Sequence, residues 1–185
     1  MSQIKERLDH LRDMIQEPDF LAGKGLSNEV NIRIFCYDAE EELIVQHFVE
    51  QIKTDQSLDC RPIVCNLYTV FLSICDDLDI MDAIHDMEES DGEMALLNEL
   101  NETIGISEFE DKMRGYPHEK GDVLILTGVG DVFPFMRIHT FLEAISKLFS
   151  NIPILVFYPG EFDGYHLKLF NRLQPNDYYR AFNII

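Results

Sequence analysis

The fold is decided within residues 122–158, which run DVLILTGVGDVFPFMRIHTFLEAISKLFSNIPILVFY. Two short runs in it, DVLILT and IPILVFY, are apolar at almost every position, and they enclose a segment whose apolar side chains recur every three or four residues. Strands without polar alternation are typical of parallel sheets covered on both faces, and the spacing between them predicts a crossover helix. This stretch therefore predicts a β-α-β unit of an α/β protein.

The same order of elements extends toward the N-terminus. Residues 3–16 place apolar side chains on one helical face, residues 18–30 predict a loop, and residues 32–37 predict a strand. Asp38 and Glu41 form a capping-box pattern, which predicts that a helix begins there. That helix is expected to run to about Lys53, and its core-facing side chains are expected to be Leu43, Ile44, Phe48 and Ile52.

Further apolar runs complete the predicted sheet. Residues 62–68 predict a strand, residues 69–78 a helix, and residues 178–185 a last strand. Pro134 is expected in the first turn of the crossover helix, where its missing N–H has no cost. Right-handed crossovers then predict a doubly wound, mostly parallel sheet of about five strands with helices on both faces, in one α/β domain over residues 1–185.

Charge separates one segment from the rest of the chain. Fifteen basic and 34 acidic residues give a net charge of −19, and residues 76–111 hold fourteen acidic residues and no basic one. This acidic block lies between the second and third predicted strands, so it is expected to be a helical insertion or cap. Asp86, Glu88, Glu89 and Asp91 are its central acids. An EF-hand requires glycine where Asp91 stands, so the block is either a solvated face or a docking surface for a basic partner.

Composition excludes several classes of function. A field of this sign repels phosphate backbones and anionic lipid, so neither nucleic acid nor membrane binding is expected. The four cysteines form no CxxC pair, which speaks against a zinc site, and no cofactor is predicted. The N-terminus lacks the apolar core of a secretion signal, and no apolar run approaches 18 residues, so a cytoplasmic protein is expected.

The glycines after the first quoted run are the most suggestive site. Gly128 and Gly130, with Asp131, follow a strand and precede a helix, as phosphate-binding turns do. The third glycine of GxGxxG would fall at Phe133, however, and no phosphate-loop lysine motif occurs in the chain. We favour a structural tight turn; the alternative is a degenerate nucleotide-binding protein, or an enzyme, with its ligand at this turn.

Polar residues near the two quoted runs offer weaker hypotheses. Arg137 could clamp an anion, and His139 could act as a base or a metal ligand. We expect instead that both flank the apolar stripe of the crossover helix and that Arg137 pairs with a neighbouring acid. After residue 158, Pro159 and Gly160 are expected to end the strand. Glu161, Asp163 and His166 could hold a metal, but we prefer Asp163 or Gly164 as the cap of a short helix that carries Leu167, Leu169 and Phe170.

No nucleophile with a matching base emerges, because the chain has no GxSxG elbow and neither Cys36 nor Cys65 resembles an exposed thiolate beside a histidine. We therefore predict a protein without catalytic activity.

Three pieces of the C-terminal part resemble the BrxB family of bacterial BREX phage-defence systems. They are GDVLILTGVGDVFPFMRIHTFLEAI, PILVFYPGEFDGYHLKLFNRL and NDYYRAFNII. The residues that carry the resemblance are Gly128, Gly130, Pro134, Arg137 and His139; then Tyr158, Pro159, Gly160, Asp163, Gly164, Leu167 and Phe170; then Tyr178, Tyr179, Arg180, Ala181 and Phe182. The N-terminal helix and the RIFCYD strand also look similar, whereas the acidic block does not match motif by motif.

The resemblance implies a core component of BREX defence and no catalytic residue. It suggests an assembly or adaptor role beside the alkaline-phosphatase-like PglZ protein, the BrxC ATPase and the PglX methyltransferase, with PglZ the first expected partner. A homo-oligomer is also possible. The interaction candidates are Arg137, His139, Asp163, Tyr178, Tyr179, Arg180 and the acids of the block.

Overall fold

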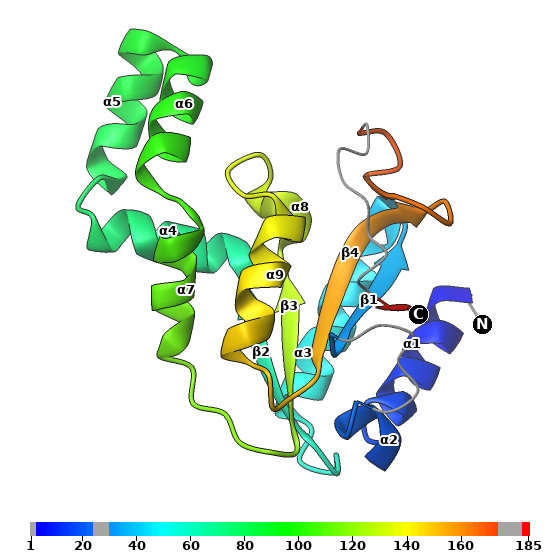
Figure 1. Ribbon diagram of the computed structural model, residues 1–185. Helices are drawn as coiled ribbons and strands as arrows, with labels where there is room; N and C mark the ends of the chain where they lie inside the picture. Colours follow the sequence, from blue (N-terminus) through cyan, green and yellow to red (C-terminus); the bar gives the residue numbers. More distant parts are fainter. Residues whose placement is uncertain (1–2, 24–29, 174–182) are drawn as a thin grey trace.

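A mostly parallel sheet forms the centre of the protein (Figure 1). The structure is a computed structural model, and it describes residues 3–23, 30–173 and 183–185. The strands lie in the order β2-β3-β4-β1-β6, all parallel, and β5 pairs antiparallel with the end of β4. Their bounds are β1 (Ile32–Tyr37), β2 (Arg61–Asn66), β3 (Asp122–Thr127), β4 (Ile154–Phe162), β5 (Leu167–Leu169) and β6 (Asn183–Ile184). The expected α/β fold with a five-stranded parallel sheet is confirmed.

Alternate residues of each strand enter two separate cores. Leu124 and Leu126 face the core beneath α4, α7 and α9, whereas Val123 and Ile125 face the core beneath α1 and α3. The chain crosses from β1 to the far edge at β2 and then returns through β3 to β4. The connection from β1 to β2 and the connections from β2 to β4 thus run in opposite directions along the sheet. Right-handed connections that run in opposite directions lie on opposite faces, so α3 covers one face and the later helices cover the other.

Helices α1 (Gln3–Met14), α2 (Pro18–Leu21) and α3 (Glu42–Thr54) cover the first face. Pro18 begins a short helix, so the expected loop over residues 18–30 is wrong at its start. The Asp38–Glu41 capping box is present, but it opens a 3₁₀ turn, η1 (Ala39–Glu41), that leads into α3. Leu43 is 79% exposed, contrary to expectation, because the buried stripe falls on Val45, Phe48, Val49 and Ile52.

Strand β2 ends two residues earlier than expected. Asn66 accepts hydrogen bonds from the backbone N–H groups of Tyr68 and Thr69, both at 3.0 Å, and so caps α4 (Leu67–Asp77). Leu67 and Tyr68 suit a strand by composition, but the cap places them in the first turn of a helix.

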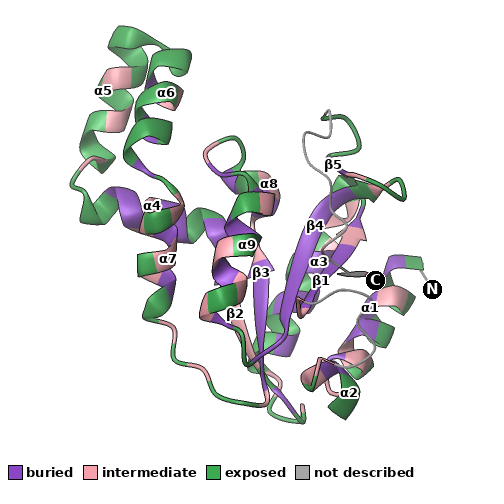
Figure 2. Cartoon of the chain, viewed as in Figure 1, coloured by how far each residue is buried: buried purple, intermediate pink, exposed green. Residues whose placement is uncertain are grey.

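The acidic block forms a helical insertion between β2 and β3, as expected. It comprises the end of α4, then α5 (Met81–Asp91), α6 (Glu93–Thr103) and most of α7 (Ile106–Arg114). Helices α5 and α6 form an antiparallel arm that projects from the body of the protein (Figure 1) and is largely exposed (Figure 2). Helix α7 returns to the core, where it buries Phe109 and Met113.

The crossover from β3 to β4 differs from expectation at Pro134. Helix α8 (Val129–Val132) is a single turn, and α9 (Ile138–Leu148) begins only after the cis Phe133–Pro134 peptide bond. Pro134 therefore lies in the connection between two helices, because the chain must reorient after α8 before the apolar face of α9 can cover the sheet.

Beyond residue 158 the predicted helix is wrong. Strand β4 continues through Pro159 and Gly160, and residues 160–162 pair antiparallel with β5. Leu167 and Leu169 are buried on either side of Lys168, which is the alternation of a strand. Asp163 and Gly164 lie in the hairpin turn between β4 and β5 and do not cap a helix.

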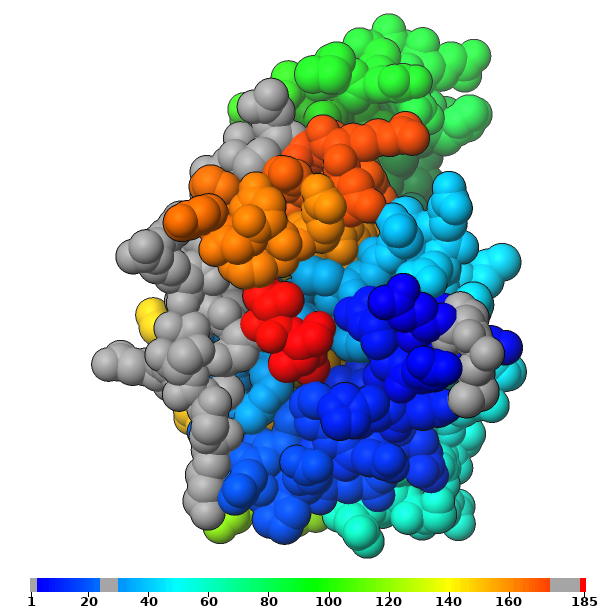
Figure 3. Space-filling view, turned by 90° about the vertical axis from the view of Figure 1, so that its right-hand side faces the viewer, coloured from blue at the N-terminus to red at the C-terminus, as the bar shows by residue number. Residues whose placement is uncertain are grey.

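The predicted last strand is present at its end. Asn183 and Ile184 pair with β1 in parallel, and the backbone N–H of Ile185 donates to the carbonyl oxygen of Ile34 at 3.0 Å. These residues lie between the β4–β5 hairpin and α1 (Figure 3). Tyr178, Tyr179, Arg180 and Phe182 lie outside the described residues.

Candidate functional site

The turn after β3 is shaped by its two glycines. Gly128 adopts a left-handed conformation, with φ of +71°, at the N-cap of α8. A β-carbon on Gly128 would lie 2.6 Å from Oδ1 of Asn66, which is the atom that caps α4. Glycine is therefore needed at this position both for its backbone conformation and for the close approach of β2 and β3.

Side chains already occupy the space that a phosphate would need at Gly130. A β-carbon there would meet the Phe170 ring at 2.8 Å and the Pro159 ring at 3.1 Å. The remaining hollow has a volume of about 100 Å³, and Asp131 lines it. Ligand sites for nucleotide-sized molecules measure roughly 300–1,000 Å³. The geometry thus favours the structural interpretation of this turn.

A larger groove crosses the carboxyl ends of the strands on the α3 side. Its volume is about 500 Å³, and it is bounded by the polar face of α3 and by the ends of β1, β2 and β3. The hydroxyl of Tyr37 donates to Oε2 of Glu42 at 2.5 Å, and burial raises the pKa of Tyr37. Burial also raises the pKa of Tyr116 to about 12, with Cys65 adding to the shift. The residues that line the groove include Glu42, Gln46, Glu50, Lys53, Asn66, Thr69, Tyr116 and Thr127.

Sequence reasoning did not single out this groove. Tyr37, Asn66 and Thr127 are each the last residue of a parallel strand, and such residues converge at one edge of the sheet. That position was the signal that could have found them, because ligands of open α/β sheets bind at the carboxyl ends of the strands.

Arg137 is exposed at the N-cap of α9 and does not lie within the helix. The expectation that it pairs with a neighbouring acid is wrong for the described part of the chain, in which no carboxylate lies within ion-pair distance of its guanidinium. It stands instead at a second pocket, of about 220 Å³, which is lined mainly by apolar side chains.

His139 is half-buried in the first turn of α9. Its Nε2 lies 3.5 Å from Oε1 of Glu143, which is one turn later in the helix.

Asp163 organises the β4–β5 turn. Its carboxylate accepts the backbone N–H groups of His166 at 2.8 Å and Tyr165 at 3.0 Å, and these bonds lower the pKa of Asp163 to about 2. The ammonium of Lys168 lies 3.3 Å from Asp163 and 3.6 Å from Glu161. A lysine thus supplies the positive charge that a metal would bring, and no cluster of three metal-ligating side chains is found in the described residues.

The central acids of the block lie on α5, where Asp86, Glu88, Glu89 and Asp91 find no basic partner in the described structure. Among the residues that the structure describes, basic side chains pair with the block only near its ends, in the Lys112–Asp77 and Arg114–Asp111 pairs at 2.5 and 3.2 Å. The arm is therefore strongly negative.

The cysteine thiols are unsuited to nucleophilic chemistry. Burial raises the pKa of Cys36 to about 12 and the pKa values of Cys60 and Cys65 to about 11. All three are therefore protonated near neutral pH.

The predicted site residues do not form one constellation. The glycine turn and Asp163 with its hairpin follow the carboxyl ends of β3 and β4, Arg137 and His139 lie at the start of α9, and the acids lie on the arm. Tyr178, Tyr179 and Arg180 fall outside the described residues. No helix in the described ranges has the length and apolarity that crossing a bilayer requires.

Comparison with known proteins identifies relatives over the whole chain. A family model described as "BREX protein BrxB" matches residues 63–184. A BREX protein BrxB of Bacillus cereus (strain H3081.97) is 36% identical over 192 residues, which covers 100% of this chain and 99% of the relative. A BREX protein BrxB of Escherichia coli O9:H4 (strain HS) is 26% identical and covers 98% and 92% of the two chains. No solved structure matches the chain significantly. The chain therefore belongs to the BrxB family of BREX proteins.

Proposed function

We propose that this protein is a non-catalytic core component of BREX defence that holds other BREX proteins together. Family membership supports the defence role. The observation that carries the assembly role is the α5–α6 arm, which adds little to the core.

The arm has the properties of a surface made for a partner. Helix α5 buries no side chain, and α6 buries only Leu96 and Leu100. Met94, near the tip of the arm, is 68% exposed, and Met81, at the start of α5, is 40% exposed. Methionines on an exposed face adapt readily to varied partners, and mutual repulsion among unpaired carboxylates opposes a compact arm unless a cation or a basic surface meets them.

PglZ is the first partner that we propose, with BrxC and PglX after it, on the ground of the family resemblance. A basic surface on the partner would be drawn to the arm at long range, and the apolar side chains would then contribute close contact.

The direct test is co-purification. The tagged full-length chain is co-expressed with the other BREX proteins of its system and purified at moderate salt. We expect at least one of them to co-elute in a fixed ratio, and to be lost when residues 81–103 are replaced by a short Gly/Ser linker. Isolation of the tagged chain alone would contradict the assembly role.

The groove at the strand ends favours a second candidate function, a small-molecule sensor. Its volume of about 500 Å³ lies within the usual range for ligand sites. Calorimetry with ATP, GTP and NAD, with and without Mg²⁺, tests it. Saturable micromolar binding that Thr69→Trp abolishes would place a ligand in the groove, and binding that Gly130→Glu abolishes would place it at the glycine turn. Absence of heat with all three compounds would speak against a nucleotide site.

A further inference from the structure

We infer that the pocket beside Arg137 receives a large apolar side chain of a protein partner, with a carboxylate next to it in the partner's sequence. This inference rests on the proposed assembly function and names a contact for it. The pocket lies where the arm rejoins the core, so a partner that docks on the arm can reach it without a change of fold.

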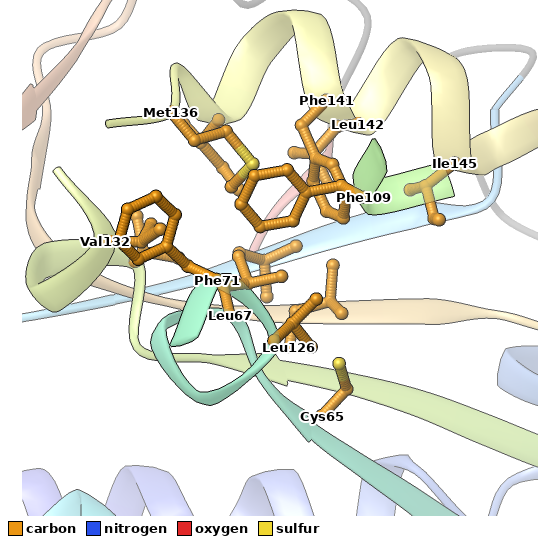
Figure 4. Close-up of a cluster of buried hydrophobic side chains, with 14 of the residues drawn as sticks. Cys65, Leu67, Phe71, Phe109, Leu126, Val132, Met136, Phe141, Leu142 and Ile145 are labelled. Carbon is orange, nitrogen blue, oxygen red and sulfur yellow. The ribbon is translucent and has the colours of Figure 1, made fainter. Parts of the chain in front are cut away.

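Two segments far apart in the sequence form the pocket. One wall is the connection from α6 to α7, with Ile104, Gly105 and Ile106, and the other is the approach to α9, with Phe135 and Met136. Phe109 also lines the pocket, and it belongs to the buried aromatic cluster with Phe71 and Phe141 (Figure 4).

The walls are held in place before any ligand arrives. The backbone N–H of Ile104 donates to the carbonyl oxygen of Leu100 at 2.8 Å, and the backbone N–H of Gly105 donates to Oε2 of Glu108 at 2.7 Å. On the other side the Phe135 ring stacks on Phe71 with centroids 4.5 Å apart. A preformed pocket binds with a smaller loss of conformational entropy than one that must be ordered.

The volume suits one side chain and not a whole cofactor. At about 220 Å³ the pocket falls below the roughly 300–1,000 Å³ that free small molecules usually occupy. An apolar anchor delivered by a protein needs no more, because the rest of the interface supplies the remaining contact area.

Arg137 determines the charge of what sits beside the anchor. Its guanidinium is exposed at the pocket, and no carboxylate of the described residues pairs with it, although the chain has 34 acidic residues. Other arginines of this chain, such as Arg12 with Asp55 and Arg61 with Asp122, are held by acids. A cation of this kind in a negative protein attracts a carboxylate selectively, and a guanidinium can bind it through two hydrogen bonds.

A second copy of this chain fits the pocket poorly. Every copy carries a net charge of −19, and docking at this junction would bring its field close to the acidic arm. The occupant is therefore a different protein whose surface is basic where it meets the arm and acidic only beside the apolar anchor.

Photo-crosslinking tests the inference at the residue level. Thr140 is exposed and lines the pocket, so p-benzoylphenylalanine is introduced there in the full chain, which is co-expressed with the other BREX proteins, purified and irradiated. We expect a crosslink to one partner segment in which an apolar residue lies within three positions of an Asp or Glu. The same crosslinker at Leu43, which is exposed on the opposite face of the sheet, is expected not to label that segment.

Substitutions of Arg137 complete the test. Arg137→Glu is expected to lower the crosslink yield at position 140 by at least about tenfold, since loss of a charge-assisted bond and reversal of charge both act against the complex. Arg137→Lys is expected to retain part of the yield. An acid at a helix N-terminus is favourable, so Arg137→Glu should fold normally, and its thermal melt checks this.

The outcomes separate the inference from the function on which it rests. If the complex purifies but position 140 gives no crosslink, or labels a segment without an acid, or is unaffected by Arg137→Glu, the pocket has been assigned wrongly and the assembly role stands. If no BREX protein co-purifies at all, the proposed function fails and this inference fails with it.

Discussion

Arg61, on the edge strand β2, forms a two-point ion pair with Asp122 on the neighbouring strand β3. Nε of Arg61 donates to Oδ1 of Asp122 at 3.0 Å, and Nη2 donates to Oδ2 at 2.5 Å. The two residues are register partners at the first position of β2 and β3. The Asp122 carboxylate is buried, at 3% exposure, and also accepts the N–H of Glu119 at 2.8 Å. The pair therefore joins the edge strand to the sheet.

Asp122→Ala should destabilise the protein by about 2 kcal/mol, because it removes the buried carboxylate that accepts hydrogen bonds from Arg61 and from the Glu119 N–H. Urea unfolding followed by circular dichroism measures the change. Asp111→Ala, which removes the acid of the exposed Arg114–Asp111 pair, is the matched control and is expected to leave the transition midpoint unchanged. Equal effects of the two substitutions would contradict the role assigned to Asp122.

Acid should weaken the β4–β5 hairpin through Asp163. Its folded pKa is lowered to about 2, chiefly by the backbone N–H of His166. A carboxylate whose pKa is lower in the folded than in the unfolded state stabilises above its unfolded pKa, near 4, and that contribution is lost as the pH falls to about 2. NMR titration of the Asp163 side chain is expected to give a midpoint near 2. Asp163→Asn should make stability less dependent on pH between 4 and 2; an unchanged slope would contradict the assignment.

Alanine at Gly128 should be costly for two separable reasons. The left-handed backbone strains any β-carbon, and Asn66 obstructs this one. The Asn66→Ala background supplies the control, because it keeps the left-handed backbone at residue 128 and removes the obstructing side chain. We expect Gly128→Ala to cost about 2–4 kcal/mol in the natural chain and about 1 kcal/mol when it is added to Asn66→Ala, in thermal or urea unfolding. Equal losses in the two backgrounds would show that Asn66 yields without cost.

Neutralising the arm should slow association with the partner. Asp86→Asn, Glu88→Gln, Glu89→Gln and Asp91→Asn together remove four charges from α5. The association rate measured by surface plasmon resonance with purified PglZ is expected to fall several-fold at low salt, and its dependence on salt to flatten.

The control for that experiment removes four charges elsewhere. Glu6, Asp9, Asp13 and Glu17 are exposed on or beside α1, on the opposite face of the sheet. Their replacement by Gln or Asn changes the net charge equally and is expected to alter the rate less. The same effect from both sets would mean that net charge alone, and not the arm, drives association.

Several functional features were accessible from the sequence, and others were not. The glycine turn was identified, because glycines at the end of a strand are recognisable locally. The pocket at Arg137 was not, because its walls are separated by about 30 positions in the chain and meet only when α7 packs beside α9. The expectation that Arg137 pairs with an acid rested on their abundance, whereas pairing depends on where the carboxylates lie.

The sequence by itself determined the central strands and the class of fold. Strands β1 and β3 have the predicted bounds, because a short apolar run rich in β-branched or aromatic residues is typical of a strand covered on both faces. The insertion between β2 and β3 was likewise evident from charge alone.

Only the tertiary structure decided the course of the chain after residue 158. Leu167 and Leu169 suit either a helix or a strand by composition, and they form a strand because residues 160–162 of β4 supply the backbone hydrogen-bond partners. The same holds for the strand order, in which β4 lies between β3 and β1. Local side-chain preferences differ by less than about 1 kcal/mol, whereas pairing with a distant strand satisfies backbone groups that would otherwise be buried without partners.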